Sequence, residues 1–334
     1  MFRHSFAVAA GIAAGSPAPT VPAADKPRAP LFGECHIRQN KNILPVSVRE
    51  RGQRRDTTRS SGPTGNHPVM TDFVSQTWLA DRLGEVAVVD VRDGWEYDGI
   101  GHIPSAVSIP FESFRAKEHA VESGDEASQG MLPGEDVWEG LLSEAGISPE
   151  DEIVAYDDTH GVFAARFLVT AELYGHDPEK LHLLDGDFSA WQLSHDVTSD
   201  APDVEPSTYD ADPPSETPLV GIEVVADAVE GAAVLVDTRE DWEFEEGHIP
   251  GAVQFDWREV VDEESRGLES PEEIGAMLAE RGITPEKRIV LYCNTARRIS
   301  HTYVVLRHLG YENLEFYEGS LTEWEAAGRP LETA

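Results

Sequence analysis

The sequence predicts an α/β protein in which two similar domains follow one another. Short runs of aliphatic and β-branched residues alternate with longer helical patterns, which is typical of parallel sheets covered by helices on both faces. The same motifs also occur twice. Asp90 recurs as Asp237 and Gly186 as Gly319, so the offset between the copies falls from 147 to 133 residues. A chain of 334 residues is long enough for about two domains.

Further motifs are shared by the two copies. They pair Val89–Arg92 with Val236–Arg239, Trp95–Tyr97 with Trp242–Phe244, Gly101–Val107 with Gly247–Val253, and Gly146–Glu150 with Gly282–Glu286. Each copy exceeds about 100 residues, far more than one unit of a solenoid. We therefore predict two globular domains, at residues 72–196 and 218–333. The stretch 197–217 between them is rich in proline and acidic residues, which favours an extended linker.

Within the second copy the pattern predicts strands at 233–236, 289–292 and 314–317. Helices are expected at 271–280, where Pro271 suits a first helical position, and at 299–309. Ligands of such sheets bind at the carboxyl ends of the strands. Asp237 and Cys293 both follow strands, so we expect both at that edge.

The first 69 residues differ in composition from the rest of the chain. They contain ten Lys and Arg against four Asp and Glu, whereas the remainder contains 16 against 58. Because this segment is rich in Pro, Ser, Gly and Arg and has no apolar period, we expect residues 1–69 to be disordered or to lie upstream of a true start at Met70. Residues 5–15 resemble a signal peptide only weakly.

The net charge of −36 excludes some classes of partner. A uniformly acidic chain repels the phosphates of nucleic acid and of anionic membranes. Such a Lys-poor surface is typical of proteins from salt-loving archaea, where salt screens the repulsion. No segment approaches the roughly 20 apolar residues that a membrane span needs.

Cysteine and histidine usage bounds the compartment and the cofactors. Cys35 and Cys293 are the two cysteines and cannot build a disulfide framework, so we expect a reduced, cytoplasmic location. His102 and His248 lie in a repeated Gly-His-Ile-Pro turn, one in each copy. With no ligand cluster nearby, we expect hydrogen-bonded structural histidines, no metal and no cofactor.

One residue differs critically between the copies. Asp157 follows an apolar run in the first copy, and Cys293 stands at the matching place in the second. The segment from Cys293 to Arg298 follows a strand and precedes a helix, so backbone N–H groups and the helix dipole favour an anion there. Arg297 and Arg298 add two cations. We therefore expect a thiolate nucleophile rather than an inert core cysteine.

These residues together resemble the tandem-domain rhodanese family, sulfurtransferases of the thiosulfate or 3-mercaptopyruvate type. The resemblance covers residues 72–333 and implies two rhodanese-like domains. Its motifs are Asp237–Arg239, Gly247–Ala252, Cys293–Arg298 and Gly319 with Trp324, together with their counterparts in the first half.

The resemblance also implies a mechanism. Cys293 would take sulfane sulfur from a small anionic donor as a persulfide, and a thiophilic acceptor such as cyanide, sulfite or a thiol would remove it. The loop residues would bind the donor with Arg239, namely Asn294, Thr295, Ala296, Arg297 and Arg298. Asp237 and His248 would support the site, Asp237 by pairing with Arg239. Asp157 would mark a degenerate site.

Two departures leave the donor open. Thiosulfate-type tandem enzymes have a substrate-binding arginine where this chain has Glu243. The loop after Cys293 also lacks the Cys-Arg-x-Gly and Cys-Gly-x-Gly patterns of the two best-known types.

Two rival functions use the same cysteine. Related phosphatases use a Cys-x5-Arg loop, whereas Arg298 gives Cys-x4-Arg, a spacing better suited to sulfur than to a tetrahedral phosphate. The alternative reading is a non-turnover persulfide carrier or interaction module in sulfur trafficking, which steady-state turnover would distinguish from an enzyme.

Overall fold

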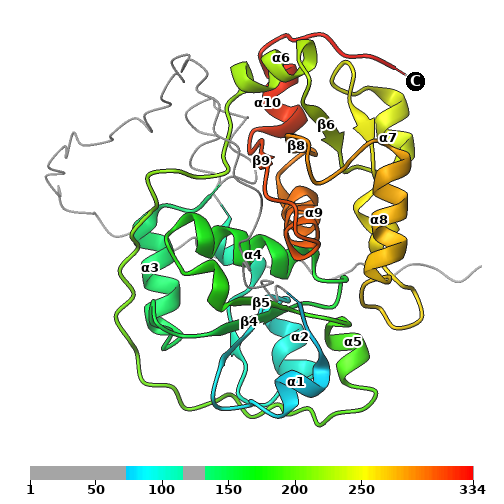
Figure 1. The fold of residues 1–334 in the computed structure, drawn as a ribbon. Coiled ribbons are helices and arrows are strands. Elements are labelled where there is room, and N and C mark those ends of the chain that lie inside the picture. The colour runs from blue at the N-terminus through cyan, green and yellow to red at the C-terminus, as the bar shows by residue number, and fades with distance from the viewer. Residues whose placement is uncertain (1–72, 116–131, 334) are drawn as a thin grey trace, which may run out of the picture. The chain divides into compact units, whose positions relative to one another are not determined.

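The structure is a computed structural model that describes residues 73–115 and 132–333. The extension predicted at 1–69 lies outside the described residues. The strands between Phe73 and Trp191 form one sheet, and those between Ile222 and Ala326 form a second (Figure 1). Helices of the same two ranges flank each sheet.

Both sheets are parallel. The first has the strand order β1-β5-β4-β2-β3 and the second the order β7-β6-β8-β9. The strands are β1 (Phe73–Val74), β2 (Ala87–Asp90), β3 (Val107–Ser108), β4 (Ile153–Tyr156), β5 (Leu181–Leu184), β6 (Val234–Asp237), β7 (Val253–Gln254), β8 (Ile289–Tyr292) and β9 (Leu314–Phe316). The predicted α/β class, with two parallel sheets flanked by helices, is confirmed.

Helices occupy the connections between the strands, as parallel pairing requires. The α-helices are α1 (Gln76–Ala80), α2 (Gly94–Gly99), α3 (Glu135–Glu144), α4 (Val162–Leu173), α5 (Asp187–Trp191), α6 (Ile222–Glu230), α7 (Asp241–Glu246), α8 (Pro271–Glu280), α9 (Arg297–His308) and α10 (Ser320–Ala326). Short 3-10 helices include η1 (Phe111–Phe114), η4 (Pro178–Lys180) and η5 (Trp257–Val260). The predicted helix at 271–280 coincides with α8, whereas α9 begins two residues before the predicted 299.

The two sheets share one register. Asp90 at the end of β2 lies opposite Tyr156 of β4, and Asp237 at the end of β6 lies opposite Tyr292 of β8. All four residues of β4 and of β8 are buried, because each is a central strand covered on both faces. Cys293 follows Tyr292 directly, so it lies at the same sheet edge as Asp237, as predicted from the strand pattern.

The two halves meet along α4 and α9, which lie side by side (Figure 1). Ten of the twelve residues of α4 are buried, since the helix packs against its own sheet on one side and against α9 on the other. Arg266 of the second half adds a polar contact, with Nη2 2.7 Å from Oδ2 of the fully buried Asp187 carboxylate in the first half.

The connection between the halves follows the surface of the first half. Residues 199–218 form neither helix nor strand. Tyr209 is nevertheless buried: its hydroxyl lies 3.1 Å from Nδ1 of His176, and its N–H donates to Oγ of Ser143. The N–H of Asp212 donates to the carbonyl of Tyr174 at 3.1 Å. These contacts tie the connection to the first half.

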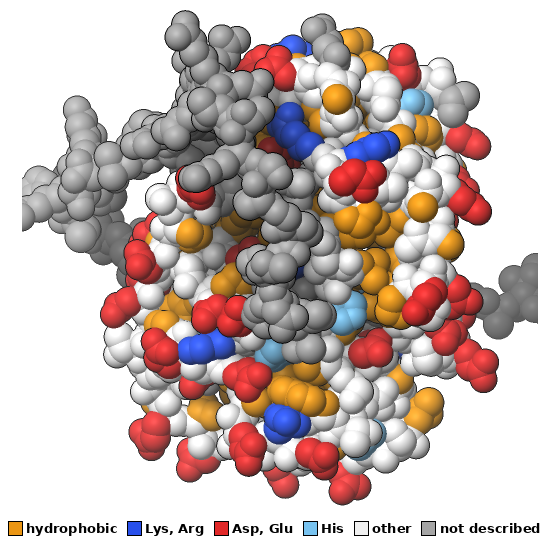
Figure 2. Space-filling view, viewed as in Figure 1, with side chains coloured by type: hydrophobic (Ala, Val, Ile, Leu, Met, Phe, Trp, Pro, Cys, Tyr) orange, Lys and Arg blue, Asp and Glu red, His pale blue; other side chains and the backbone are white. Residues whose placement is uncertain are grey.

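Acidic side chains are spread over the visible face of the molecule rather than gathered in one patch (Figure 2). This distribution agrees with the charge pattern of the sequence. Among the described residues, no helix combines the length and the apolar character that crossing a membrane would need.

Candidate active site

Cys293 is held in the turn between β8 and α9. Its residue is 1% exposed, and its N–H donates to Oγ of Ser320 at 3.3 Å. Its carbonyl accepts from the N–H of Leu321 at 2.9 Å. Ala296 has a φ of 64°, a left-handed conformation that reverses the chain just before α9 begins at Arg297. Contacts from α10 and a tight turn therefore fix the backbone that carries the thiol.

The start of α9 presents unsatisfied backbone donors beside Cys293. Within the described part of the chain, the N–H groups of residues 294–299 donate to no acceptor. The first turn of any helix leaves such groups open, and they favour a negative charge. A negative charge bound at this place would therefore be stabilised by backbone dipoles.

In the first half, the corresponding group of backbone N–H donors, here called the cradle, is bound by a side chain of the same loop. Asp157 is 1% exposed, and its carboxylate accepts four backbone N–H groups at the start of α4. Oδ1 accepts from Thr159 at 2.7 Å and from Gly161 at 2.8 Å, and Oδ2 accepts from Phe163 at 2.8 Å and from Ala164 at 3.0 Å. Burial raises the pKa of Asp157, and the four donors counteract that effect. This loop is an anion site occupied by its own carboxylate.

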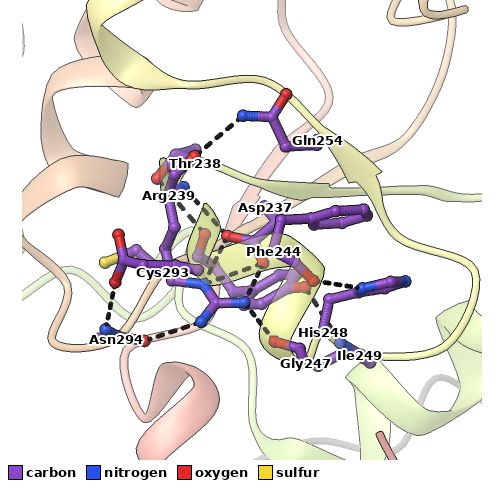
Figure 3. Close-up of polar contacts among 12 residues, drawn as sticks. Asp237, Thr238, Arg239, Phe244, Gly247, His248, Ile249, Gln254, Cys293 and Asn294 are labelled. Atoms are coloured by element: carbon purple, nitrogen blue, oxygen red, sulfur yellow. Dashed lines mark hydrogen bonds and ion pairs between the residues drawn. The ribbon is translucent and has the colours of Figure 1, made fainter. Parts of the chain in front are cut away.

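Arg239 forms an ion pair with Asp237 next to the cysteine loop, the segment from Cys293 to Arg298 (Figure 3). Nε lies 2.9 Å from Oδ1 and Nη2 lies 2.7 Å from Oδ2 of Asp237, and both residues are buried. Nη2 also donates to the carbonyl of Gly247 at 2.7 Å. The remaining nitrogen, Nη1, reaches Oδ1 of Asn294 at 3.4 Å. The guanidinium thus touches the loop through Asn294, and a direct contact with a donor stays a prediction.

Glu243 joins α7 to the cysteine loop. Its Oε1 accepts from Nδ2 of Asn294 at 2.9 Å and from Nη2 of Arg298 at 3.0 Å, and its Oε2 accepts from Nη1 of Arg298. Burial raises the pKa of Glu243, but the Arg298 guanidinium outweighs burial and holds that pKa below its usual value. Burial likewise lowers the pKa of Arg298, and the Glu243 carboxylate raises it overall. The positive charge of Arg298 is therefore balanced by the carboxylate of Glu243.

Arg297 faces the first half of the chain and has no carboxylate partner among the described residues. Its guanidinium carbon lies 5.5 Å from the ring centre of Phe163 and 5.8 Å from that of Phe111. Burial lowers the pKa of Arg297, Cys293 and more weakly Glu112 oppose this effect, and Arg115 and Arg298 add to it. Of the two adjacent loop arginines, Arg297 is the more exposed.

The rings of the two turn histidines stack on aromatic rings of the preceding helices and contact backbone carbonyls. Nδ1 of His248 lies 2.8 Å from the carbonyl of Phe244, and the two rings stack at 3.7 Å between centroids (Figure 3). His102 stacks on Tyr97 at the same distance. Among the residues that the structure describes, no cluster of three or more His, Cys, Asp or Glu could hold a metal ion.

Several site contacts were not anticipated from the sequence. They come from Glu243 with Arg298, from Ser320, and from Phe111 and Phe163 of the first half. The repeated Trp-Glu-aromatic motif could have indicated Glu243, because it places a glutamate at the same helix position in both halves. Nothing in the sequence pattern indicates that aromatic rings of the cysteine-less half face Arg297.

Comparisons with known proteins match both halves of the chain. The Rhodanese-like domain family matches residues 75–194 and 222–327. A thiosulfate sulfurtransferase of Pseudomonas aeruginosa is 32% identical over 263 residues, which cover 74% of this chain and 91% of the relative. Putative thiosulfate sulfurtransferases of Mycobacterium bovis and Haloferax volcanii are 35% and 30% identical, each over 78% of this chain and over 97% and 96% of the relative.

Solved structures share the fold. The 3-mercaptopyruvate sulfotransferase SseA from Escherichia coli has a TM-score of 0.63 at 24% identity, covering 75% of this chain and 98% of that chain. An EanB variant bound to ergothioneine has a TM-score of 0.68 at 19% identity, covering 79% and 70%. Since both domains and nearly the whole length of the relatives are matched, the chain belongs to the rhodanese family and carries two rhodanese-like domains.

Proposed function

We propose that this protein is a sulfurtransferase that carries sulfane sulfur on Cys293. One observation carries the proposal: Cys293 stands on a cradle of open backbone N–H groups, whereas the equivalent cradle in the first domain is filled by Asp157. The naming of the relatives as thiosulfate sulfurtransferases supports the same class of reaction.

The reaction has two steps. With thiosulfate, the Cys293 thiolate attacks the outer sulfur, the S–S bond breaks, and sulfite leaves with the bonding electron pair. With 3-mercaptopyruvate, the C–S bond breaks, and the leaving enolate takes up a proton to give pyruvate. In the second step cyanide or a thiol attacks the outer sulfur of the persulfide. Thiocyanate or a new persulfide forms, and the Cys293 thiolate is regenerated.

The surrounding groups have separate roles in this proposal. The N–H groups of residues 294–299 stabilise the charge on the thiolate and on the persulfide, as an oxyanion hole stabilises developing charge. Arg297 attracts the anionic donor. Asp237 holds Arg239, and Arg239 in turn orients Asn294. His248 fixes the turn after α7 through the carbonyl of Phe244.

The proposal is tested on the purified full-length protein. After exposure to thiosulfate or to 3-mercaptopyruvate, mass spectrometry should find one added sulfur on Cys293, and cyanide should remove it as thiocyanate. Cys293→Ser should abolish both results. Full thiocyanate production by Cys293→Ser would overturn the proposal.

Steady-state kinetics distinguish an enzyme from a carrier. An enzyme turns over many times with a small donor and cyanide, whereas a persulfide carrier forms one persulfide and releases it only to a protein partner. We expect multiple turnovers, because an open cradle and a free cation suit a small anionic donor.

A further inference from the structure

The charges around Cys293 are almost completely compensated within the protein. Arg239 is paired with Asp237, and Arg298 is paired with Glu243. In the described part of the chain, Arg297 has no such partner. Arg115, which also acts on Arg297, is paired with Glu112. Among the described arginines near the cysteine, a donor therefore meets one guanidinium that forms no salt bridge.

Glu243 is the group that removes the Arg298 charge from the site. Both of its oxygens face Arg298, and Oε1 also accepts from Asn294, the residue that follows Cys293. The side chains of Arg298 and Glu243 are 20% and 11% exposed, so solvent screens the pair only partly. The ion pair lies against the loop and not on the open surface.

The first domain shows that a glutamate at this helix position does not require an arginine. Glu96 occupies the equivalent place in α2, and like Glu243 it accepts the backbone N–H of the residue that precedes its helix. Its neighbour across the loop is Asp158 in place of Asn294. Burial raises the pKa of Glu96, and the Asp158 carboxylate raises it further. The glutamate at this position therefore pairs with a loop arginine in the domain that carries the cysteine and with no loop arginine in the described part of the first domain.

We infer that Glu243 is a specificity-determining residue that sets the charge of the donor this site accepts. By neutralising Arg298, it leaves a site matched to a donor with one negative charge, such as the carboxylate of 3-mercaptopyruvate. It disfavours a dianion such as thiosulfate, which would bring a second negative charge beside the thiolate and the Glu243 carboxylate. This inference rests on the proposed sulfurtransferase function.

The test compares two donors on two matched variants. Glu243→Gln keeps an acceptor for Asn294 but removes the negative charge, so Arg298 becomes available to the donor. We expect kcat/KM for thiosulfate, divided by kcat/KM for 3-mercaptopyruvate, to rise about fivefold at low ionic strength, mainly through KM for thiosulfate. The rise should shrink in concentrated salt. Glu96→Gln removes the same charge at the equivalent position in the first domain and should leave the ratio unchanged.

A variant of opposite sign completes the test. Arg298→Gln leaves the Glu243 charge uncompensated, so the ratio should fall, and this holds as a test even if Glu243→Gln fails to fold. An unchanged ratio in the folded variants, in a wild-type protein that turns over, would overturn the role of Glu243 alone. A wild-type protein that forms no persulfide on Cys293 with either donor would overturn both this inference and the proposed function.

Discussion

Asp157 and Cys293 occupy equivalent positions, each directly after the central strand of its sheet and before the helix that packs against the other domain. The carboxylate of Asp157 accepts four backbone N–H groups, and the corresponding groups after Cys293 have no acceptor among the described residues. The same loop is thus filled by its own carboxylate in one domain and leaves its backbone N–H groups without a described acceptor in the other. The two loops are copies of one motif, and the side chain at the position of Asp157 or Cys293 determines whether the backbone donors are bound.

Asp157→Asn should destabilise the protein without removing its activity. An asparagine offers one acceptor oxygen, so part of the buried cradle loses its partner, and we expect the free energy of unfolding to fall by about 2–4 kcal/mol. Urea unfolding at neutral pH, followed by circular dichroism, measures this change. Persulfide formation on Cys293 should persist under native conditions.

Asp158→Asn is the matched control for that substitution. The Asp158 carboxylate accepts from Thr159 Oγ1 at 3.3 Å and lies close to Glu96. Its charge is repelled by Glu96 and attracted by Arg92 and Arg266, so its removal should leave stability nearly unchanged. If both asparagine variants were as stable as the wild type, the Asp157 cradle would contribute little to stability.

The sequence was sufficient for the fold class and for the position of Cys293 at the sheet edge. The duplicated motifs and the apolar runs predicted parallel sheets, and the rule that ligands bind at strand ends placed Asp237 and Cys293 at one edge. The start of α9 was predicted two residues late. Ala296 adopts a left-handed turn that residues other than glycine rarely adopt, so no propensity indicates it.

The charge state of the site could not be predicted in the same way. Arg297 and Arg298 are adjacent and chemically identical, yet one faces Phe163 of the other domain and the other binds Glu243, which lies 55 residues earlier. Which arginine is free depends on side-chain direction and on packing between domains. Neither side-chain direction nor packing between domains can be inferred from the periodic pattern of apolar residues.

Arg297→Ala should weaken the binding of the donor. Because Arg297 is the uncompensated guanidinium beside the cysteine loop, its removal should raise KM for an anionic donor about tenfold and reduce kcat much less. Arg297→Lys should recover part of the loss, since the charge is retained without the planar fork. Initial rates of thiocyanate formation measure these effects.

Arg288→Ala provides the control for the loss of an arginine. Arg288 precedes β8, at the opposite end of the strand from Cys293, and pairs with Glu315 at 2.6 Å. Its removal should leave KM unchanged. An Arg297→Ala variant with the wild-type KM would show that the donor is held by other groups.

His301 should make the stability of the protein depend on pH. The imidazole is fully buried in α9, its ring contacts those of Phe73 and Trp257, and burial lowers its pKa to about 4. The neighbouring His160 has two smaller and opposed effects, because its backbone raises the pKa of His301 and its imidazole charge lowers that pKa. Because the pKa in the unfolded chain is higher, the unfolded state binds more protons below about pH 6.5. The stability due to neutral His301 is present above that pH and is lost as the pH falls toward 4.

His301→Leu should remove this part of the pH dependence. Between pH 7 and pH 5 the wild-type protein should lose about 2 kcal/mol more unfolding free energy than the variant, as measured by urea unfolding at the two pH values. Trp257→Phe alters the packing around the same ring without changing a titrating group, so it should lower stability equally at both. Parallel pH profiles for wild type and His301→Leu would contradict this prediction. They would mean that His301 binds a proton as readily in the folded protein as in the unfolded chain, despite its burial between the domains.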